Sequence, residues 1–272
     1  MEMWLLQISW DANPEIFRIG SLAVRWYGLF WALSFYIGYE IISRIFKKEN
    51  LPAAHADKIL IYMAVGSIVG ARLGHCFFYD FEYYSRNLIE VLYIWQGGLA
   101  SHGGAIGILI ALYFYQKKVS NQSFAWLLDR LVIPVSLAAF FIRMGNLMNS
   151  EIYGVETSLP WGFIFENRGE VVPKHPTQIY EGLAYLILFV TLGWLYVKKR
   201  TRLPEGFLTG FFALFMFTAR FLVEFIKEPQ SPFEENMLLN MGQILSIPAI
   251  IAGIGFMVYA FRKQKKERKK SP

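Results

Sequence analysis

A cation, two amides and a carboxylate follow one another closely around residue 143. The sequence Arg143-Met-Gly-Asn146-Leu-Met-Asn149-Ser-Glu151 stands where a long apolar stretch gives way to a polar one. A guanidinium group presents a planar fork of N–H donors, which matches the oxygen atoms of a phosphate. The sequence therefore predicts that Arg143 binds an anionic group such as a phosphate.

A second arginine lies on a helical stripe. Met216, Arg220, Glu224 and Lys227 recur at helical spacing, so they share one face of a helix. The spacing of Arg220 and Glu224 allows an ion pair within that helix. Such a pair either neutralises itself and is structural, or orients the guanidinium of Arg220 toward an anion. The spacing alone leaves both possibilities open.

Two further clusters combine ionisable residues with glycines. In the segment 66–75, Gly66, Gly70 and Gly74 form a seam suited to close helix packing, and Arg72 and His75 lie away from it. Arg72 could face a polar cavity and bind phosphate, whereas His75 is equally well explained as a core residue. His102 stands beside glycines that leave it accessible, and imidazole is a common proton-transfer group. Those glycines could equally form a second packing seam.

The elements that position these residues are long apolar stretches. The chain is 55% hydrophobic, and its apolar runs reach the roughly 20 residues that a helix needs to cross a bilayer. Helices satisfy their own backbone hydrogen bonds where water is absent. The sequence predicts an all-α polytopic membrane protein with about seven spans, at residues 22–43, 58–79, 97–116, 124–144, 178–197, 206–226 and 240–261. Arg25 and Arg130 lie near span ends, where snorkelling or local pairing explains them.

The basic residues of the loops predict the orientation of the chain. Most of them fall in alternate loops near 44–58, 117–118 and 198–202, and in the tail 262–272, which we therefore predict to be cytoplasmic. Seven spans then put the N-terminus outside. We expect a single transmembrane domain over 1–272, with an extracytoplasmic loop at about 145–177 that is long enough to be a functional cap.

The charge distribution, the single cysteine and the N-terminal residues argue against nucleic-acid binding, an internal disulfide and a cleavable signal peptide. The net charge of +6 is concentrated in the tail after an apolar helix, which predicts contact with the anionic lipid headgroups of a bilayer and no binding of nucleic acid. The single cysteine, Cys76, cannot form an internal disulfide. The first 23 residues lack a basic start followed by an apolar core, so no cleavable signal peptide is expected.

The sequence argues against two classes of membrane protein. A transporter or channel would have polar residues across the full membrane depth and often related halves, but the polar motifs concentrate toward the outer half and no repeat is evident. A phosphotransferase acting on another lipid headgroup would normally carry clustered carboxylates for a metal ion. The sequence does not display such a cluster.

Six motifs in order give the chain a specific resemblance. They are Arg25-Trp-Tyr27-Gly28, Gly70-Ala-Arg72-Leu-Gly74, His102-Gly-Gly104, the segment from Arg143 to Gly154, His175-Pro-Thr-Gln178-Ile-Tyr180-Glu181, and Arg220-Phe-Leu-Val-Glu224. Together they resemble the bacterial prolipoprotein diacylglyceryl transferases over residues 21–262.

The resemblance implies a reaction and its partners. The diacylglyceryl group of phosphatidylglycerol moves to the lipobox cysteine thiol of a preprolipoprotein signal peptide, a thioether forms, and glycerol phosphate leaves. The resemblance implies no metal and no dissociable cofactor, and it locates the enzyme in the bacterial inner membrane, with the chemistry at its outer face.

The resemblance also implies roles for individual residues. Arg143 and Arg220 would neutralise the departing phosphate, and His102 would be a candidate base for the thiol or an orienting donor. The remaining residues are expected to bind substrate or shape the site, with Glu224 holding Arg220; they are Tyr27, Arg72, Asn146, Glu151, Gly154 and Glu224. The family commonly has a tyrosine where this chain has Met216. A phenol at that position is therefore not part of the mechanism here.

Overall fold

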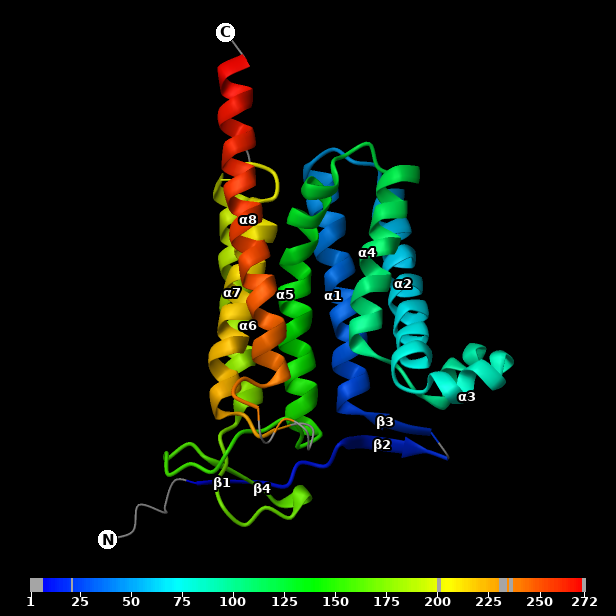
Figure 1. The fold of residues 1–272 in the computed structure, drawn as a ribbon, viewed down its shortest axis with the longest axis vertical. Helices are drawn as coiled ribbons and strands as arrows, with labels where there is room; N and C mark the ends of the chain where they lie inside the picture. The colour runs from blue at the N-terminus through cyan, green and yellow to red at the C-terminus, as the bar shows by residue number, and fades with distance from the viewer. Residues whose placement is uncertain (1–6, 21, 200–201, 230–233, 235–236, 271–272) are drawn as a thin grey trace. The chain divides into compact units, whose positions relative to one another are not determined.

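Long helices form most of the structure (Figure 1). The computed structural model describes the chain except residues 1–6, 21, 200–201, 230–233, 235–236 and 271–272. Within the described part, six helices are long and apolar enough to cross a membrane. They are α1 (Trp26–Lys48), α2 (Ala54–Phe78), α5 (Phe124–Met148), α6 (Thr177–Lys199), α7 (Phe207–Val223), continued by the 3₁₀ turn η5 (Glu224–Ile226), and α8 (Met241–Lys270). A helical multi-pass membrane protein is thereby confirmed.

The stretch predicted to span at 97–116 forms helix α4 (Ser101–Lys118), which is not one of these six. Its 18 residues extend about 27 Å at 1.5 Å per residue, slightly less than the hydrocarbon layer of about 30 Å. Lys117 and Lys118 occupy its last turn. The seventh span and the orientation of the termini stay predictions at this point.

Short strands accompany the helices, and the all-α prediction did not include them. Strand β1 (Ile8–Trp10) pairs in parallel with β4 (Phe163–Phe165), and β2 (Glu15–Ile19) pairs antiparallel with β3 (Leu22–Arg25). Each strand has only three to five residues, which is too short to produce a clear alternation of apolar and polar residues. The other short elements are α3 (Phe81–Arg86), η2 (Leu88–Leu92), η3 (Ile94–Gln96) and η4 (Glu166–Arg168).

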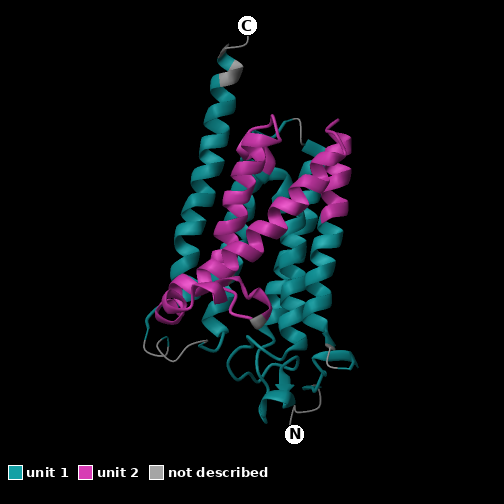
Figure 2. Cartoon of the chain, turned by 90° about the vertical axis from the view of Figure 1, so that its right-hand side faces the viewer, with its two compact units in different colours: residues 1–38, 128–272 teal, residues 39–127 magenta. Residues whose placement is uncertain are grey.

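The chain folds as two compact units (Figure 2). Unit 1 contains residues 1–38 and 128–272, and unit 2 contains residues 39–127. Of the residues expected at the site, Arg72 and His102 belong to unit 2 and the others to unit 1. The two units are therefore described one at a time.

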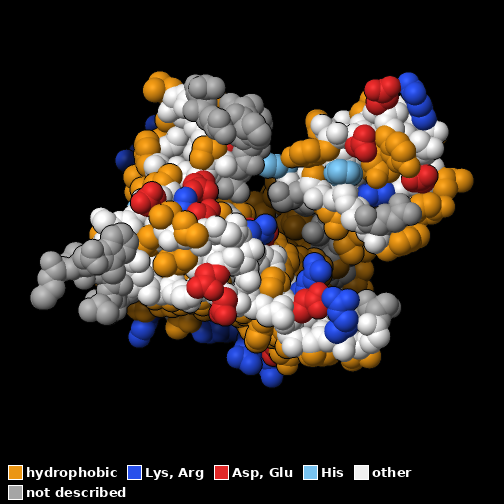
Figure 3. Space-filling view, turned by 90° about the horizontal axis from the view of Figure 1, so that it is seen from below, with side chains coloured by type: hydrophobic (Ala, Val, Ile, Leu, Met, Phe, Trp, Pro, Cys, Tyr) orange, Lys and Arg blue, Asp and Glu red, His pale blue; other side chains and the backbone are white. Residues whose placement is uncertain are grey.

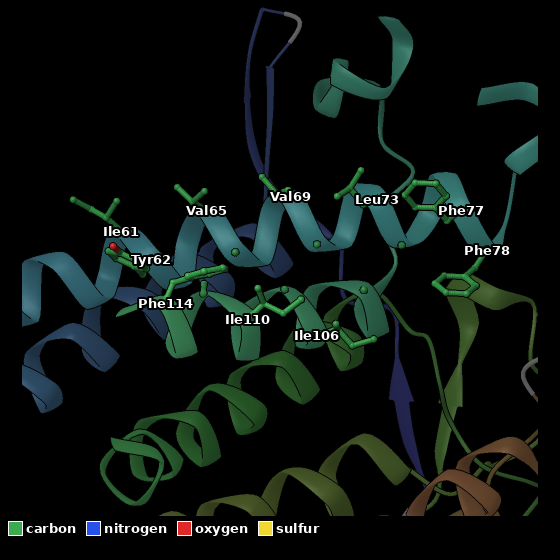
Figure 4. Close-up of a pocket in the computed structure, with 16 residues that line it drawn as sticks. Ile61, Tyr62, Val65, Val69, Leu73, Phe77, Phe78, Ile106, Ile110 and Phe114 are labelled. Atoms are coloured by element: carbon green, nitrogen blue, oxygen red, sulfur yellow. The ribbon is translucent and has the colours of Figure 1, made fainter. Parts of the chain in front are cut away.

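In unit 2, α2 and α4 pack backbone against backbone through glycines. A Cβ atom added at Gly70 would lie 2.4 Å from the carbonyl oxygen of Gly103, and one at Gly66 would lie 2.7 Å from that of Gly107. Both predicted seams are therefore real, and they face each other. An apolar groove of about 680 Å³ follows the two helices, and Val69, Leu73 and Ile110 are among the side chains on its walls (Figure 4).

In unit 1, a close contact and a cap hold the helices together. Gly210 of α7 faces Gly253 of α8. A Cβ atom added at Gly210 would lie 2.7 Å from the carbonyl oxygen of Gly253. Asp129 of α5 accepts hydrogen bonds at 2.8 Å from the backbone N–H groups of Gly206 and Thr209, at the start of α7. A carboxylate at a helix N-terminus satisfies free N–H groups and interacts favourably with the helix dipole. These contacts fix α7, which carries Arg220.

Candidate active site

Four buried charged side chains form a continuous chain in unit 1. Nε of Arg143 (α5) lies 2.7 Å from Oε2 of Glu181 (α6), a close ion contact rather than an aligned hydrogen bond. Nζ of Lys227, which follows η5, lies 3.2 Å from Oε1 of Glu181 and 2.8 Å from Oε2 of Glu224. Two cations and two anions alternate, so the group is neutral as a whole. Buried charges are tolerated when they are paired in this way.

A local change of helix type explains the pairing of Glu224 with Lys227. Helix α7 ends at Val223 and tightens into the 3₁₀ turn η5. Lys227 directly follows this turn, and its backbone N–H donates to the carbonyl oxygen of Glu224 at 3.4 Å, so the two residues lie next to each other. The carboxylate of Glu224 also packs against Gly242 of α8, where an added Cβ would lie 2.4 Å from its Cδ.

The ion pair between Arg220 and Glu224 that the spacing allowed is not formed. Glu224 is engaged by Lys227, and no hydrogen bond or ion pair joins Arg220 to any residue that the structure describes. Arg220 is half-buried in the last turn of α7. It is therefore a cation in an apolar helix that lacks an anionic partner in the described part of the chain. The expectation that Glu224 holds Arg220 directly is corrected accordingly.

Asn146 and Glu151 extend the buried chain toward the end of α5. Nη1 of Arg143 donates to Oδ1 of Asn146 at 3.1 Å, and Nδ2 of Asn146 donates to Oε1 of Glu151 at 2.8 Å. Asn149 donates to the same oxygen of Glu151 at 3.3 Å. The contacts of Arg143 with Glu181 and Asn146 use only part of the five N–H donors of its guanidinium. Further N–H groups of Arg143 are thereby left to bind an anion.

The backbone around Glu151 is strained and firmly clamped. Ser150 and Ile152 have φ values of 51° and 61°, which a β-branched residue such as Ile152 rarely adopts. The side chain of Gln178 donates to the carbonyl oxygen of Glu151, and that of Thr177 to the carbonyl oxygen of Ile152, both at 2.7 Å. The start of α6 therefore holds the turn that aims the carboxylate of Glu151. Strain of this kind is found where the surrounding structure over-determines a conformation, often at functional sites.

Gly154 lies where three backbone segments meet. An added Cβ would lie 2.2 Å from the carbonyl oxygen of Ile226, 2.7 Å from Cβ of His175 and 2.8 Å from Cγ2 of Thr177. Its N–H donates to the carbonyl oxygen of His175 at 2.8 Å, and it forms a β-bridge with Lys227. Gly154 thus links the segment after α5 to the residue that carries the buried ammonium group.

Tyr27 and Arg25 stand at the start of α1. The ring of Tyr27 packs against Gly145 of α5, where an added Cβ would lie 2.7 Å from Cδ2 of Tyr27. Tyr27 therefore approaches the backbone between Arg143 and Asn146. Arg25 is exposed and lies 3.6 Å from Glu15, in agreement with local pairing.

Arg72 organises the segment that follows α3 in unit 2. Its guanidinium donates to the carbonyl oxygens of Glu90 at 2.5 Å, Val91 at 2.9 Å and Gly97 at 2.7 Å, and it lies 4.9 Å from the ring centroid of Tyr84. Most of its N–H groups are thus used by the protein itself. A role in substrate binding stays a prediction for Arg72. His102 is exposed at the second residue of α4, and its role as a base also stays a prediction.

The segment between α5 and α6 is tied to β1 and to the segment after η5. Nζ of Lys174 lies 2.6 Å from Glu228 and 3.4 Å from Glu170. Burial acts to lower the pKa of Lys174, but the hydrogen bonds and charges of Glu228 and Glu170 together outweigh it and raise the pKa. Burial lowers the pKa of His175. The lower face in Figure 3 displays charged side chains of both signs among apolar ones.

Among the described residues, no three His, Cys, Asp or Glu side chains group so as to hold a metal ion.

Sequence reasoning missed two of the four residues in the buried chain. Glu181 stood in a recognised motif, and Lys227 was recognised on the stripe with Arg220, but neither was given a role. The available signal was the presence of Glu181 one helical turn into an apolar span. An isolated carboxylate there needs a cation nearby, and its partners come from other helices.

The helices and the buried ion chain define a multi-pass membrane protein with a polar site inside its helical bundle. A family model for prolipoprotein diacylglyceryl transferase matches residues 14–259. The chain therefore belongs to the prolipoprotein diacylglyceryl transferase family, as the resemblance of its motifs indicated. A transporter function finds no support in this assignment.

Curated relatives resemble the chain over nearly its whole length. It is 42% identical to a protein of Tolumonas auensis, covering 94% of this chain and 99% of the relative, and 43% identical to one of Chloroherpeton thalassium, covering 96% and 97%. A protein of Porphyromonas gingivalis is 44% identical, covering 94% of this chain and 95% of the relative. All three are named phosphatidylglycerol–prolipoprotein diacylglyceryl transferase.

Proposed function

We propose that this chain transfers the diacylglyceryl group of phosphatidylglycerol to the cysteine thiol of a lipobox in a preprolipoprotein. The observation that carries the proposal is the arrangement of two arginines within the membrane helices. Arg143 is oriented by Glu181 and Asn146, and Arg220 is left without an anionic partner among the described residues. A phosphate headgroup would supply the missing negative charge. Family membership and the names of the relatives support the choice of substrates.

The reaction is a displacement at a carbon that bears a phosphate ester. The sulfur of the peptide cysteine forms a bond with the glyceryl carbon, the carbon–oxygen bond to the phosphate breaks, and glycerol phosphate leaves with the bonding electrons. The thiolate is the nucleophilic form, so the thiol proton must pass to a base, for which His102 is our candidate. Arg143 and Arg220 stabilise the charge that grows on the leaving phosphate, because fixed charges in a dry site need no reorganisation.

We propose that the other predicted residues bind or frame the lipid. Asn146 and Glu151 hold the side of Arg143 that faces away from the anion, and Gly154 fixes the position of the Lys227 backbone. Tyr27 contacts the backbone at Gly145 and limits the space beside Arg143. Glu224 acts through Lys227, and no pairing with Arg220 is involved.

A seventh span is part of the proposal, and strand pairing supports it. Strand β1 precedes α1, whereas its partner β4 follows α5. Two paired strands must lie on the same side of the membrane, so an even number of crossings must separate them. Helices α1, α2 and α5 provide three crossings, and α4 provides the fourth. With seven crossings and a basic C-terminal tail on the cytoplasmic side, β1, β4 and the segment between α5 and α6 lie outside.

This topology fits an enzyme of the bacterial inner membrane that acts at its outer face. The end of α5 with Arg143 and Asn146, and the start of α6 with Glu181, would lie at the outer side, where a secreted preprolipoprotein presents its lipobox. Both substrates are embedded in the bilayer, so each can reach the site laterally.

A reconstituted assay tests the proposal. Purified protein is mixed with phosphatidylglycerol and a synthetic lipobox peptide, and mass spectrometry follows the peptide cysteine. We expect a mass gain of one diacylglyceryl group together with release of glycerol phosphate. Arg143→Ala should abolish both products. Arg44→Ala, which changes an exposed residue near the C-terminal end of α1, should leave both products unchanged. An unmodified peptide with the folded wild-type protein would refute the proposed function.

The role of His102 is tested separately. His102→Gln removes the proton acceptor and keeps a polar side chain of similar size. We expect the transfer rate to fall about 10²-fold or more, as is typical when a general base is lost. A thiolate generated by raising the pH should recover part of the rate. Unchanged activity of His102→Gln would remove His102 from the mechanism.

A further inference from the structure

The buried lysine and glutamate of unit 1 lie behind the arginine that the proposed reaction uses. Lys227 and Glu181 are 5% and 0% exposed, so water cannot substitute for either partner. Each of them contacts two oppositely charged groups. Glu181 lies between Arg143 and Lys227, and Lys227 lies between Glu181 and Glu224. Neither residue has an assigned role in the reaction.

We infer that Lys227 and Glu181 are positioning residues, which together set the orientation of the Arg143 guanidinium and keep it available for the lipid phosphate. This inference rests on the proposed function. Its basis is geometric, because the Nε of Arg143 contacts Oε2 of Glu181, and Lys227 contacts the other oxygen, Oε1. Both oxygens of the Glu181 carboxylate are thus held in place, so the group cannot rotate away from Arg143.

Lys227 also determines how strongly Glu181 attracts Arg143. If Glu181 contacted Arg143 alone, its negative charge would neutralise the guanidinium. The carboxylate would then compete with an incoming phosphate for Arg143. Because Lys227 shares the negative charge of Glu181, the guanidinium is held in place with part of its charge uncompensated. Electrostatic interactions of this kind are strong in a buried site, since the effective dielectric constant is low.

Lys227 itself is placed by three elements of unit 1. Its side chain contacts Glu224 of η5, its backbone forms a β-bridge with Gly154, and the neighbouring carbonyl of Ile226 accepts from the N–H of Val155 at 2.9 Å. The segment after α5 and the segment after α7 therefore fix the ammonium group from two directions. A residue so constrained can transmit its position to Arg143 through Glu181.

Single variants separate a positioning role from a purely structural one. Lys227→Met replaces the side chain with a slightly shorter, unbranched one and removes its charge. We expect kcat to fall about 10- to 100-fold, as a misplaced reacting group does, while KM for phosphatidylglycerol changes less than about threefold. Lys227→Arg can still bridge two carboxylates and should recover most of kcat. Lys263→Met, which alters the lysine paired with Glu205 at 3.4 Å, serves as the control and should retain wild-type kcat.

A double-mutant cycle tests whether Lys227 acts through Glu181. Glu181→Gln keeps the shape of the side chain, and combining it with Lys227→Met removes both charges together. If the two residues act as one unit, kcat of the double variant should be no lower than that of the worse single variant. Losses that multiply, or a Lys227→Met protein with wild-type kcat and only a lower melting temperature, would overturn the inference.

The outcome for the wild type keeps the two hypotheses apart. If the wild-type protein does not modify the peptide, the proposed function itself fails. If the wild type is active and Lys227→Met is folded and equally active, only the positioning role fails. Should Lys227→Met not fold, the rate of Glu181→Gln and the recovery in Lys227→Arg still decide the question.

Discussion

Gly154→Ala should damage the site through a single added methyl group. The new Cβ would lie 2.2 Å from the carbonyl oxygen of Ile226. This distance is 0.8 Å shorter than 3.0 Å, below which Cβ contacts are essentially never found in proteins. That oxygen belongs to the backbone and accepts a hydrogen bond from Val155 at 2.9 Å, so it cannot simply swing aside. The clash must therefore move the backbone that leads into Lys227.

The expected size of the effect follows from this displacement. Forcing an extra carbon into a packed region typically costs about 1–3 kcal/mol of stability. The backbone shift needed is about 1 Å, and a misplacement of that size near reacting groups can reduce a rate about 10²-fold. We therefore expect a folded protein with a lower melting temperature and a transfer rate about two orders of magnitude below that of the wild type.

The assay combines thermal unfolding in detergent with initial rates of peptide modification. Gly193→Ala is the matched control, because an added Cβ at this position of α6 meets nothing within 4 Å. This control should keep both its stability and its rate. If Gly154→Ala proved as stable and as active as the wild type, the close approach of the three segments at Gly154 would not exist in the functional protein.

Three further predictions concern other parts of the chain. Asp129→Ala removes the cap of α7 and should lower stability by about 1–2 kcal/mol with little change in kcat, as measured by thermal unfolding and the transfer assay. Gly103→Leu should separate α2 from α4, because even a Cβ there would lie 2.3 Å from the Gly70 carbonyl oxygen, and the protein should lose most of its folded yield. The pKa of His175 is lowered by burial from its usual 6.5, so its contribution to stability is present above pH 6.5 and is lost as pH falls through the folded-state value. Proteolysis of the segment 149–176 should consequently become faster in mild acid, and less so in His175→Phe.

Each of these predictions has an outcome that contradicts it. An Asp129→Ala protein with wild-type stability would mean that the cap contributes nothing. Normal expression and melting of Gly103→Leu would mean that the two glycine seams are not in contact. A proteolysis rate with the same pH dependence in the wild type and in His175→Phe would assign the acid sensitivity to another group.

The sequence predicted the helices well because their signal is local. Apolar stretches of about 20 residues mark spans regardless of their neighbours, and spaced glycines mark packing seams on a single helix. The four short strands were missed for the opposite reason. Strand β1 has three residues, and its stability depends on β4, more than 150 positions away in the sequence. Local patterns do not contain such pairings.

The cations of the candidate site stand out in the sequence, whereas their partners do not. Arg143 and Arg220 are conspicuous because charge in an apolar stretch is costly. The spacing of Arg220 and Glu224 suggested an ion pair. In the structure α7 ends in the 3₁₀ turn η5, and Glu224 pairs with Lys227 instead. The pairing of Arg143 with Glu181 joins two different helices, so it depends on tertiary packing that periodicity does not reveal.

The pairing of β1 with β4 has a consequence for the order of assembly. Residues 8–10 are synthesised early, yet their partner strand at 163–165 follows α1, α2, α4 and α5 in the sequence. In the proposed topology the early strand therefore stays unpaired, on the outer side, until these helices have entered the bilayer. A bulky fusion that keeps this strand in the cytoplasm should leave β4 without its neighbour, even though every helix has been inserted.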